Sequence, residues 1–136
     1  MSVGSWTPDS EKSADGYLPS ESTLREFIAL SREQSLESMS DTLAKSVLEN
    51  DSAAMRLSLD QWKSLSDVFD EQELYFLIQF FTRAEMLLPG WEAGAESPVI
   101  WINKILRQRK KPLNKEQLVW IKSNSSNKFI PNGALM

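Results

Sequence analysis

One stretch of the chain decides its fold, and it reads Asp70-Glu-Gln-Glu-Leu-Tyr-Phe-Leu-Ile-Gln-Phe-Phe-Thr-Arg-Ala-Glu-Met-Leu-Leu88. Wound as a helix, this stretch carries apolar residues on nearly every face, so other parts of the chain must cover it. Asp70 followed by Glu73 is a capping-box pattern, which indicates where the helix begins. Pro89-Gly90 ends it, because proline disfavours helix at the residue before it and glycine tolerates left-handed angles. We therefore predict a central apolar helix over about residues 71–88.

Helical signals continue on both sides of this stretch. Capping boxes are indicated at Thr23 with Glu26, Ser58 with Gln61, and Asn114 with Gln117. Ser97-Pro98 offers an N-cap and a favoured first residue for a helix over 98–111. No strand-like alternation competes with these patterns. We expect an all-α fold, a small single-domain bundle of five or six helices around the central one.

Two apolar stripes lie upstream of the central helix. One is centred near Leu24, and the other runs over Leu36–Val47 at spacings of three and four. On a straight helix the two stripes would point roughly 110° apart. This predicts a break near residues 31–35. Any apolar excess left over on 36–50 would favour pairing with a second copy of the chain, so a homodimer is one expectation.

The chain of 136 residues has the length of one domain. Residues 1–19 are rich in Ser, Asp, Gly and Pro and are expected to form a flexible leader. The helical domain is expected over residues 20–130, with a C-terminal tail over 131–136. Phe129 and Ile130 are expected to hold the start of that tail against the core.

The composition excludes several kinds of chemistry. The chain has no Cys and no His, which removes Cys or His metal ligands, Cys nucleophiles and His-based triads. No phosphate-binding or dinucleotide-binding motif is present, so no cofactor is expected. Gln79, Arg83 and Glu85 interrupt the longest apolar stretch, which is also too short to span a bilayer. These features predict a cytoplasmic protein that is not an enzyme and does not enter a membrane.

The charge is divided between the two parts of the chain. Residues 1–97 contain 7 basic and 18 acidic residues, a formal charge of −11, whereas residues 98–136 contain 8 basic residues and one acidic residue, a charge of +7. On a helical wheel three of the cations form one outward row. The candidate anion-binding or nucleic-acid-binding residues are Lys104, Arg107, Lys111, Lys115 and Lys122. The simpler interpretation is that the two parts neutralise each other in the fold.

A nucleic-acid-binding role would use the basic face of helix 98–111. Such helices usually present polar side chains near their N-terminus to base edges, but here the first turn is Pro98-Val-Ile-Trp101. Only Asn103, Arg107 and Gln108, further along, could reach a base. Cations near a helix C-terminus also have a purely structural explanation, since they complement the helix dipole.

Polar residues within the central helix form the second candidate site. Glu85 projects into the apolar arc of the helix and needs partners if it is buried. The structural interpretation is a tether to a basic side chain or to free amides near Pro98. The functional interpretation is a ligand-binding or enzymatic pocket near Glu85 and Arg83.

The tryptophans form the third candidate. Trp91, Trp101 and Trp120 lie within thirty residues of one another and could contact a partner, although core filling is the more common use of such residues. Trp91 follows the Pro-Gly break and is expected to be exposed. Taken together, the sequence predicts a non-catalytic protein–protein interaction or regulatory module, with nucleic-acid binding as the alternative and the Glu85/Arg83 pocket as the third hypothesis.

Overall fold

The computed structural model describes residues 18–133. These residues form seven α-helices and three short 3-10 helices, with no strand, so the predicted all-α class is confirmed. The α-helices are α1 (Glu21–Arg32), α2 (Met39–Thr42), α3 (Lys45–Asn50), α4 (Leu59–Ser66), α5 (Glu71–Leu87), α6 (Pro98–Gln108) and α7 (Lys115–Ser123), and the 3-10 helices are η3 (Leu36–Ser38), η4 (Asp51–Arg56) and η5 (Gly94–Glu96). Most of the expected leader and the last three residues of the expected tail lie outside the described residues.

Local capping chemistry sets most of the helix starts. Both hydrogen bonds of the capping box form at the starts of α4, α5 and α7, as the sequence predicts. The Ser97 side chain accepts a hydrogen bond from the Val99 N–H, and Pro98 opens α6. The box predicted at Thr23 is wrong, because Ser20 caps α1 one turn earlier and its hydroxyl accepts from the Thr23 N–H at 3.1 Å.

The second apolar stripe is broken into short pieces. α1 ends at Arg32, where the break was predicted, but Leu43 then leaves the helical conformation with ψ of 142° and separates α2 from α3. This division explains why seven helices form instead of five or six. Leu36, Met39 and Leu43 are all buried within the chain. Val47, the last residue of the stripe, is half-buried, so most of the stripe is covered within the chain and the homodimer stays a prediction.

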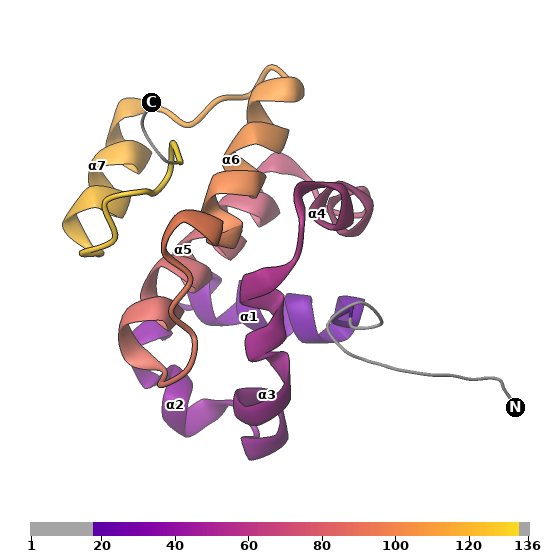
Figure 1. Ribbon diagram of the computed structural model, residues 1–136, viewed down its shortest axis with the longest axis vertical. Coiled ribbons are helices and arrows are strands. Elements are labelled where there is room, and N and C mark those ends of the chain that lie inside the picture. Colours follow the sequence, from indigo (N-terminus) through magenta and orange to yellow (C-terminus); the bar gives the residue numbers. More distant parts are fainter. Residues whose placement is uncertain (1–17, 134–136) are drawn as a thin grey trace, which may run out of the picture.

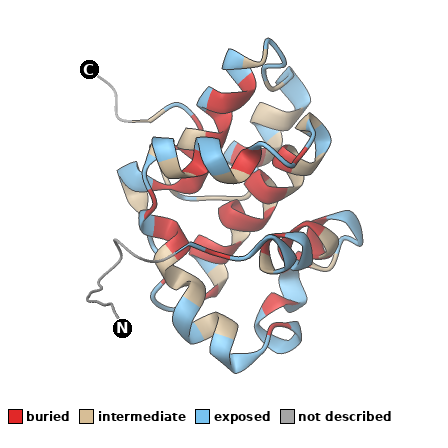
Figure 2. Ribbon diagram, turned by 90° about the vertical axis from the view of Figure 1, so that its right-hand side faces the viewer, coloured by how far each residue is buried: buried red, intermediate tan, exposed pale blue. Residues whose placement is uncertain are grey.

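Helix α5 packs closely against α1 and α6. The Phe27 and Phe80 rings stack with their centroids 3.9 Å apart, and Trp62 meets Phe81 edge-on at 5.4 Å. Figure 2 shows the buried residues gathered on the inward faces of the helices. Burial of these large side chains supplies most of the driving force for the fold. No helix within residues 18–133 is long and apolar enough to cross a membrane.

The chain end returns across α6. Ile130 and Pro131 are buried, and the carbonyl of Pro131 accepts a hydrogen bond from the Asn103 side chain at 3.0 Å. Phe129 is 40% exposed, so the expectation that it packs into the core is wrong. Figure 1 shows the resulting arrangement, with α6 and α7 at one end of the long axis and α2 and α3 at the other.

Candidate interaction surface

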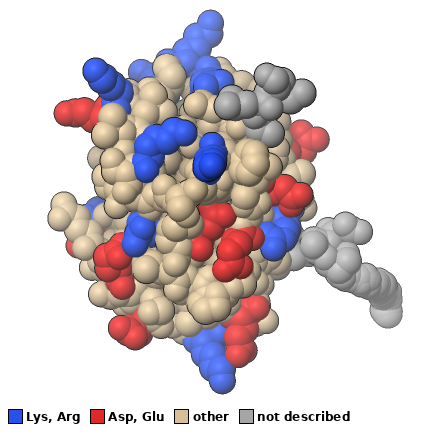
Figure 3. Space-filling model, turned by 60° about the vertical axis from the view of Figure 1, so that its left-hand side comes forward, with Lys and Arg blue, Asp and Glu red and all other residues tan. Residues whose placement is uncertain are grey.

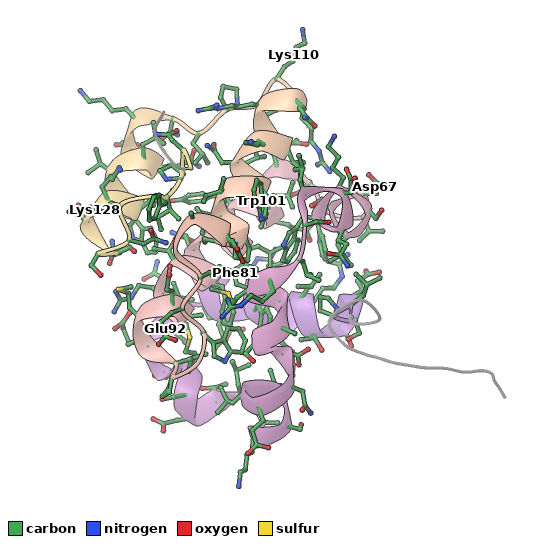
Figure 4. All side chains as sticks on the ribbon, viewed as in Figure 1. Asp67, Phe81, Glu92, Trp101, Lys110 and Lys128 are labelled. Carbon is green, nitrogen blue, oxygen red and sulfur yellow. The ribbon has the colours of Figure 1, made fainter. Side chains whose placement is uncertain are left out.

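The five cations predicted as an anion-binding set all lie at the surface. Lys104 and Arg107 come from α6, Lys111 from the α6–α7 turn, and Lys115 and Lys122 from α7, and each is exposed. Figure 3 shows one face of the molecule, on which most Lys and Arg side chains lie in the upper half and most Asp and Glu side chains in the lower half. Figure 4 places Lys110 at the tip beyond α6. We use the term basic end for Lys104, Arg107, Lys110, Lys111, Lys115 and Lys122.

Within residues 18–133, one cation of the basic C-terminal part, Arg109, pairs with a carboxylate of the acidic part. Arg109 Nη1 lies 3.0 Å from Glu71 Oε2, and its guanidinium also donates to the carbonyls of Phe69 and Ser66, each at 2.8 Å. Arg109 is therefore committed to joining α6 to the α4–α5 turn. No cation of the basic end forms an ion pair with another residue in the range 18–133.

Helix α6 is poorly placed to read bases. Its first residues, Pro98, Val99 and Ile100, are buried, so this end of the helix cannot enter a nucleic-acid groove. Asn103 is buried and its side chain donates to the Pro131 carbonyl, so the prediction that Asn103 could reach a base is wrong. Arg107 donates to Asn132 Oδ1 at 3.0 Å. Gln108 is exposed, so of the three candidates Arg107 and Gln108 remain at the surface, and the outward face of α6 offers charge with few groups for base-specific hydrogen bonding.

The three candidate tryptophans have different surroundings. Trp91 is fully buried and its indole N–H donates to the Leu48 carbonyl at 3.1 Å, so the expectation of an exposed Trp91 is wrong. The Pro-Gly turn folds the chain back over the core, where Trp91 meets Phe27 and Phe80 edge-on. Trp101 and Trp120 are half-buried. The Lys104 Nζ lies 5.3 Å from the Trp101 ring centroid, a cation–π contact beside the basic end.

Glu85 is 6% exposed, and its carboxylate is bonded only to amides within residues 18–133. Its Oε2 accepts from the backbone N–H groups of Ala93 and Gly94 at 2.8 and 2.9 Å, and its Oε1 accepts from Asn127 Nδ2 at 2.9 Å. These three hydrogen bonds offset the cost of burying the charge. They also connect the middle of the chain to its C-terminal segment.

Arg83 belongs to a different cluster from Glu85. Its guanidinium donates two hydrogen bonds to Glu37, at 2.8 and 2.9 Å, and one to the carbonyl of Asn124 at 2.7 Å. Arg83 does not line the pocket that is lined by Glu85, Met86 and Phe129. The structure therefore does not bring Glu85 and Arg83 together in one pocket. Among residues 18–133 no group of three or more acidic side chains is arranged to hold a metal ion.

Sequence reasoning overlooked a polar groove between α5 and α7. Its wider part has a volume of about 650 Å³ and is lined by residues from α1, the turn after α1, α5, α6, the α6–α7 turn and α7. Tyr75 lies in its wall, and burial raises the pKa of this phenol above its ordinary value. The one sequence signal was the glutamines, since four of the six in the chain line this groove.

Comparison with protein family models, curated proteins and solved structures finds no match to this chain. The function is therefore inferred from the surface and the groove themselves.

Proposed function

We propose that this chain is a non-catalytic interaction module whose basic end binds an acidic segment of a protein partner. In this proposal α5 is the central helix of a small bundle, and α6 and α7 present the cations on one side of it. The observation that carries the proposal is that the cations of the basic end are exposed and lack carboxylate partners within the described residues.

The rest of the molecule strengthens the charge argument. The formal net charge is −4, and residues 1–97 carry a charge of −11, so the cations stand out against an acidic background. Unpaired cations at a surface lose little hydration until a partner arrives, and complementary charge accelerates the encounter. The cation–π pair of Lys104 and Trp101 places an aromatic side chain beside the charge, and aromatic side chains are enriched in protein interfaces.

A protein partner fits this surface better than a nucleic acid does. The buried first turn of α6 and the committed Asn103 leave few groups for reading bases. The acidic remainder of the chain would also repel a long polyanion, whereas a short acidic segment can contact the basic end alone. Nucleic-acid binding through Lys104, Arg107 and Lys111 remains the alternative, and the experiment must distinguish it from binding of an acidic protein segment.

The test is a calorimetric titration of the full chain with a glutamate-rich peptide and, in parallel, with duplex DNA of equal charge. We expect the peptide to bind at low salt and to weaken as the ionic strength rises. Replacing both Lys104 and Lys122 with Gln should lower the affinity for the peptide about tenfold or more. The matched control replaces Lys45 and Lys63, which are also exposed, and should leave the affinity unchanged.

Two results would overturn the proposal. One is an affinity for duplex DNA that equals or exceeds the affinity for the peptide, which would favour the nucleic-acid alternative. The other is an equal loss of peptide affinity in the Lys45 and Lys63 control, which would show that any surface lysine contributes. Self-association and a cytoplasmic location stay predictions, and light scattering of the same samples measures the first.

A further inference from the structure

The groove between α5 and α7 continues beyond its wider part. A narrower section of about 330 Å³ extends it to the half-buried Trp120, and the two sections share Ser31, Gln34 and Gln79. The Ser31 hydroxyl donates to the Phe76 carbonyl at 2.6 Å, which fixes the end of α1 against α5. Together the two sections form a pocket of the size that takes small organic ligands, and one wall of it is held in place.

The charges along the groove favour an anion. Among the described residues, Glu71 and Glu37 are the only carboxylates that line its two sections, and Arg109 and Arg83 pair with them. The groove also contains two cations, Arg32 and Lys111, and neither forms an ion pair with another residue in the range 18–133.

Arg32 is the better positioned of these two cations. Its guanidinium carbon lies 5.3 Å from the Phe76 ring centroid, so the aromatic face orients the cation beside the groove. A planar guanidinium held in this way can donate two parallel hydrogen bonds to a carboxylate or a phosphate. Lys111 adds a second positive charge from the α6–α7 turn.

Uncharged hydrogen-bonding groups surround the cations. The side chains of Gln34, Gln72, Gln79 and Gln117 line the groove, and each amide can donate and accept. The Tyr75 hydroxyl accepts from Gln79 at the long distance of 3.5 Å, and its own hydrogen has no acceptor within residues 18–133. Phe76, Leu106 and Leu113 provide apolar area between these polar groups.

Gln34 occupies a backbone position that usually favours glycine. Its φ is 58°, at the point where α1 ends with hydrogen bonds from the Gln34 N–H to Ser31 and from the Ser35 N–H to Leu30. Lys110 has φ of 63° at the equivalent point after α6, but its side chain does not line the groove. The two residues therefore share one backbone geometry and differ in whether the side chain reaches the groove.

We propose that this groove binds a small organic anion, a carboxylate or phosphate attached to an aromatic ring. Arg32 and Lys111 hold the anionic group, the ring packs on the apolar area, and the glutamine amides and Tyr75 bind polar substituents. This site shares Lys111 with the basic end, but Lys104 and Lys122, on which the peptide test rests, do not line the groove.

The test is an NMR titration of the full chain with phenylacetate, phenyl phosphate and the neutral phenylacetamide. We expect both anions to shift the side-chain amide signals of Gln34, Gln79 and Gln117 and to saturate below about 10 mM. Phenylacetamide should bind at least about fivefold more weakly, because it lacks the charge that Arg32 and Lys111 recognise. A carboxylate that binds without the phosphate, or the reverse, identifies which anion the site prefers and supports the proposal.

Variants provide the matched controls. Lys111→Gln should lower the affinity for phenylacetate about fivefold. Lys110→Gln, one residue away and outside the groove, should leave this affinity unchanged. Gln34→Gly should weaken binding while leaving the thermal midpoint equal or higher, and Lys110→Gly should raise the midpoint in the same way without affecting binding. This pair separates a loss of side-chain contact from a loss of structure.

Three results would overturn the proposal. They are the absence of saturable shifts with either anion, equal affinity for phenylacetamide and phenylacetate, and unchanged affinity in both Lys111→Gln and Gln34→Gly. None of them bears on the glutamate-rich peptide, whose binding is tested with Lys104 and Lys122.

Discussion

Asn127 is bonded to Glu85 and also to the segment that Glu85 holds. Its side-chain Nδ2 donates to Glu85 Oε1 at 2.9 Å and to the Gly94 carbonyl at 3.0 Å, while the Gly94 N–H donates to Glu85 Oε2 at 2.9 Å. A single buried carboxylate in α5 thereby joins the segment before α6 to the segment after α7. The helices that carry the basic end are held in place from both of their ends.

Replacing Glu85 with Gln should therefore destabilise the protein although the two side chains have almost the same shape. The glutamine amide has only one oxygen, so its NH2 group must face either the N–H donors of Ala93 and Gly94 or the NH2 donor of Asn127. We expect a loss of about 1–3 kcal/mol in the free energy of unfolding, measured by urea denaturation. The exposed Glu92→Gln is the control and should change stability by less than about 0.5 kcal/mol. Equal stability of Glu85→Gln and the natural chain would show that this connection contributes nothing.

Glycine should stabilise the protein at two positions where natural side chains occupy left-handed backbone. Gln34 has φ of 58° and Lys110 has φ of 63°. Because glycine adopts these angles without a steric cost, Gln34→Gly and Lys110→Gly should each raise the free energy of unfolding by up to about 1 kcal/mol. Thermal unfolding monitored by circular dichroism measures both. A drop in stability for either variant would mean that its side chain makes contacts that outweigh the backbone strain.

The ion pair of Glu37 and Arg83 should make part of the stability depend on pH. The hydrogen bonds from Arg83 lower the pKa of Glu37, so the folded protein releases this proton more readily than the unfolded chain does. The stabilisation is complete above the unfolded-state pKa and is lost as the pH falls through the folded-state pKa. Because the Glu37 side chain is 68% exposed, the contribution should be only about 0.5 kcal/mol.

Unfolding of Glu37→Gln and the natural chain across pH checks this expectation. The two should differ at neutral pH and converge only as the pH falls through the folded-state pKa of Glu37, which lies below the ordinary value for a glutamate. A difference in the free energy of unfolding that persists unchanged at acidic pH would show that it comes from packing and not from the charge of Glu37.

The features that could be predicted from the sequence are those fixed by neighbouring residues. The capping boxes at Ser58, Asp70 and Asn114 depend on side chains three positions apart, and all three form. The surface position of the cations of α6 follows in the same way from helical spacing. At α1 the Thr23 pattern was outcompeted by Ser20, because Glu21 and Ser22 extend the helix by a further turn.

The features that could not be predicted depend on distant segments. Trp91 follows a turn that would suit exposure, and its burial depends on Phe27, Phe80 and the Leu48 carbonyl, which come from other parts of the chain. Asn103 is likewise removed from the surface by Pro131. The groove is assembled from helices and turns that are far apart in the sequence, from α1 to α7, so no single periodicity or motif could have indicated it.

The central claim, that the basic end binds acidic protein segments, is tested most directly by mapping where such a segment contacts the chain. In an NMR titration of the labelled protein with a glutamate-rich peptide, the backbone amide signals of Lys104, Lys115 and Lys122 and their neighbours should shift progressively. The signals of α2, α3 and α4 should stay in place. Shifts that concentrate on α2 to α4, or no shift at low salt, would contradict the account.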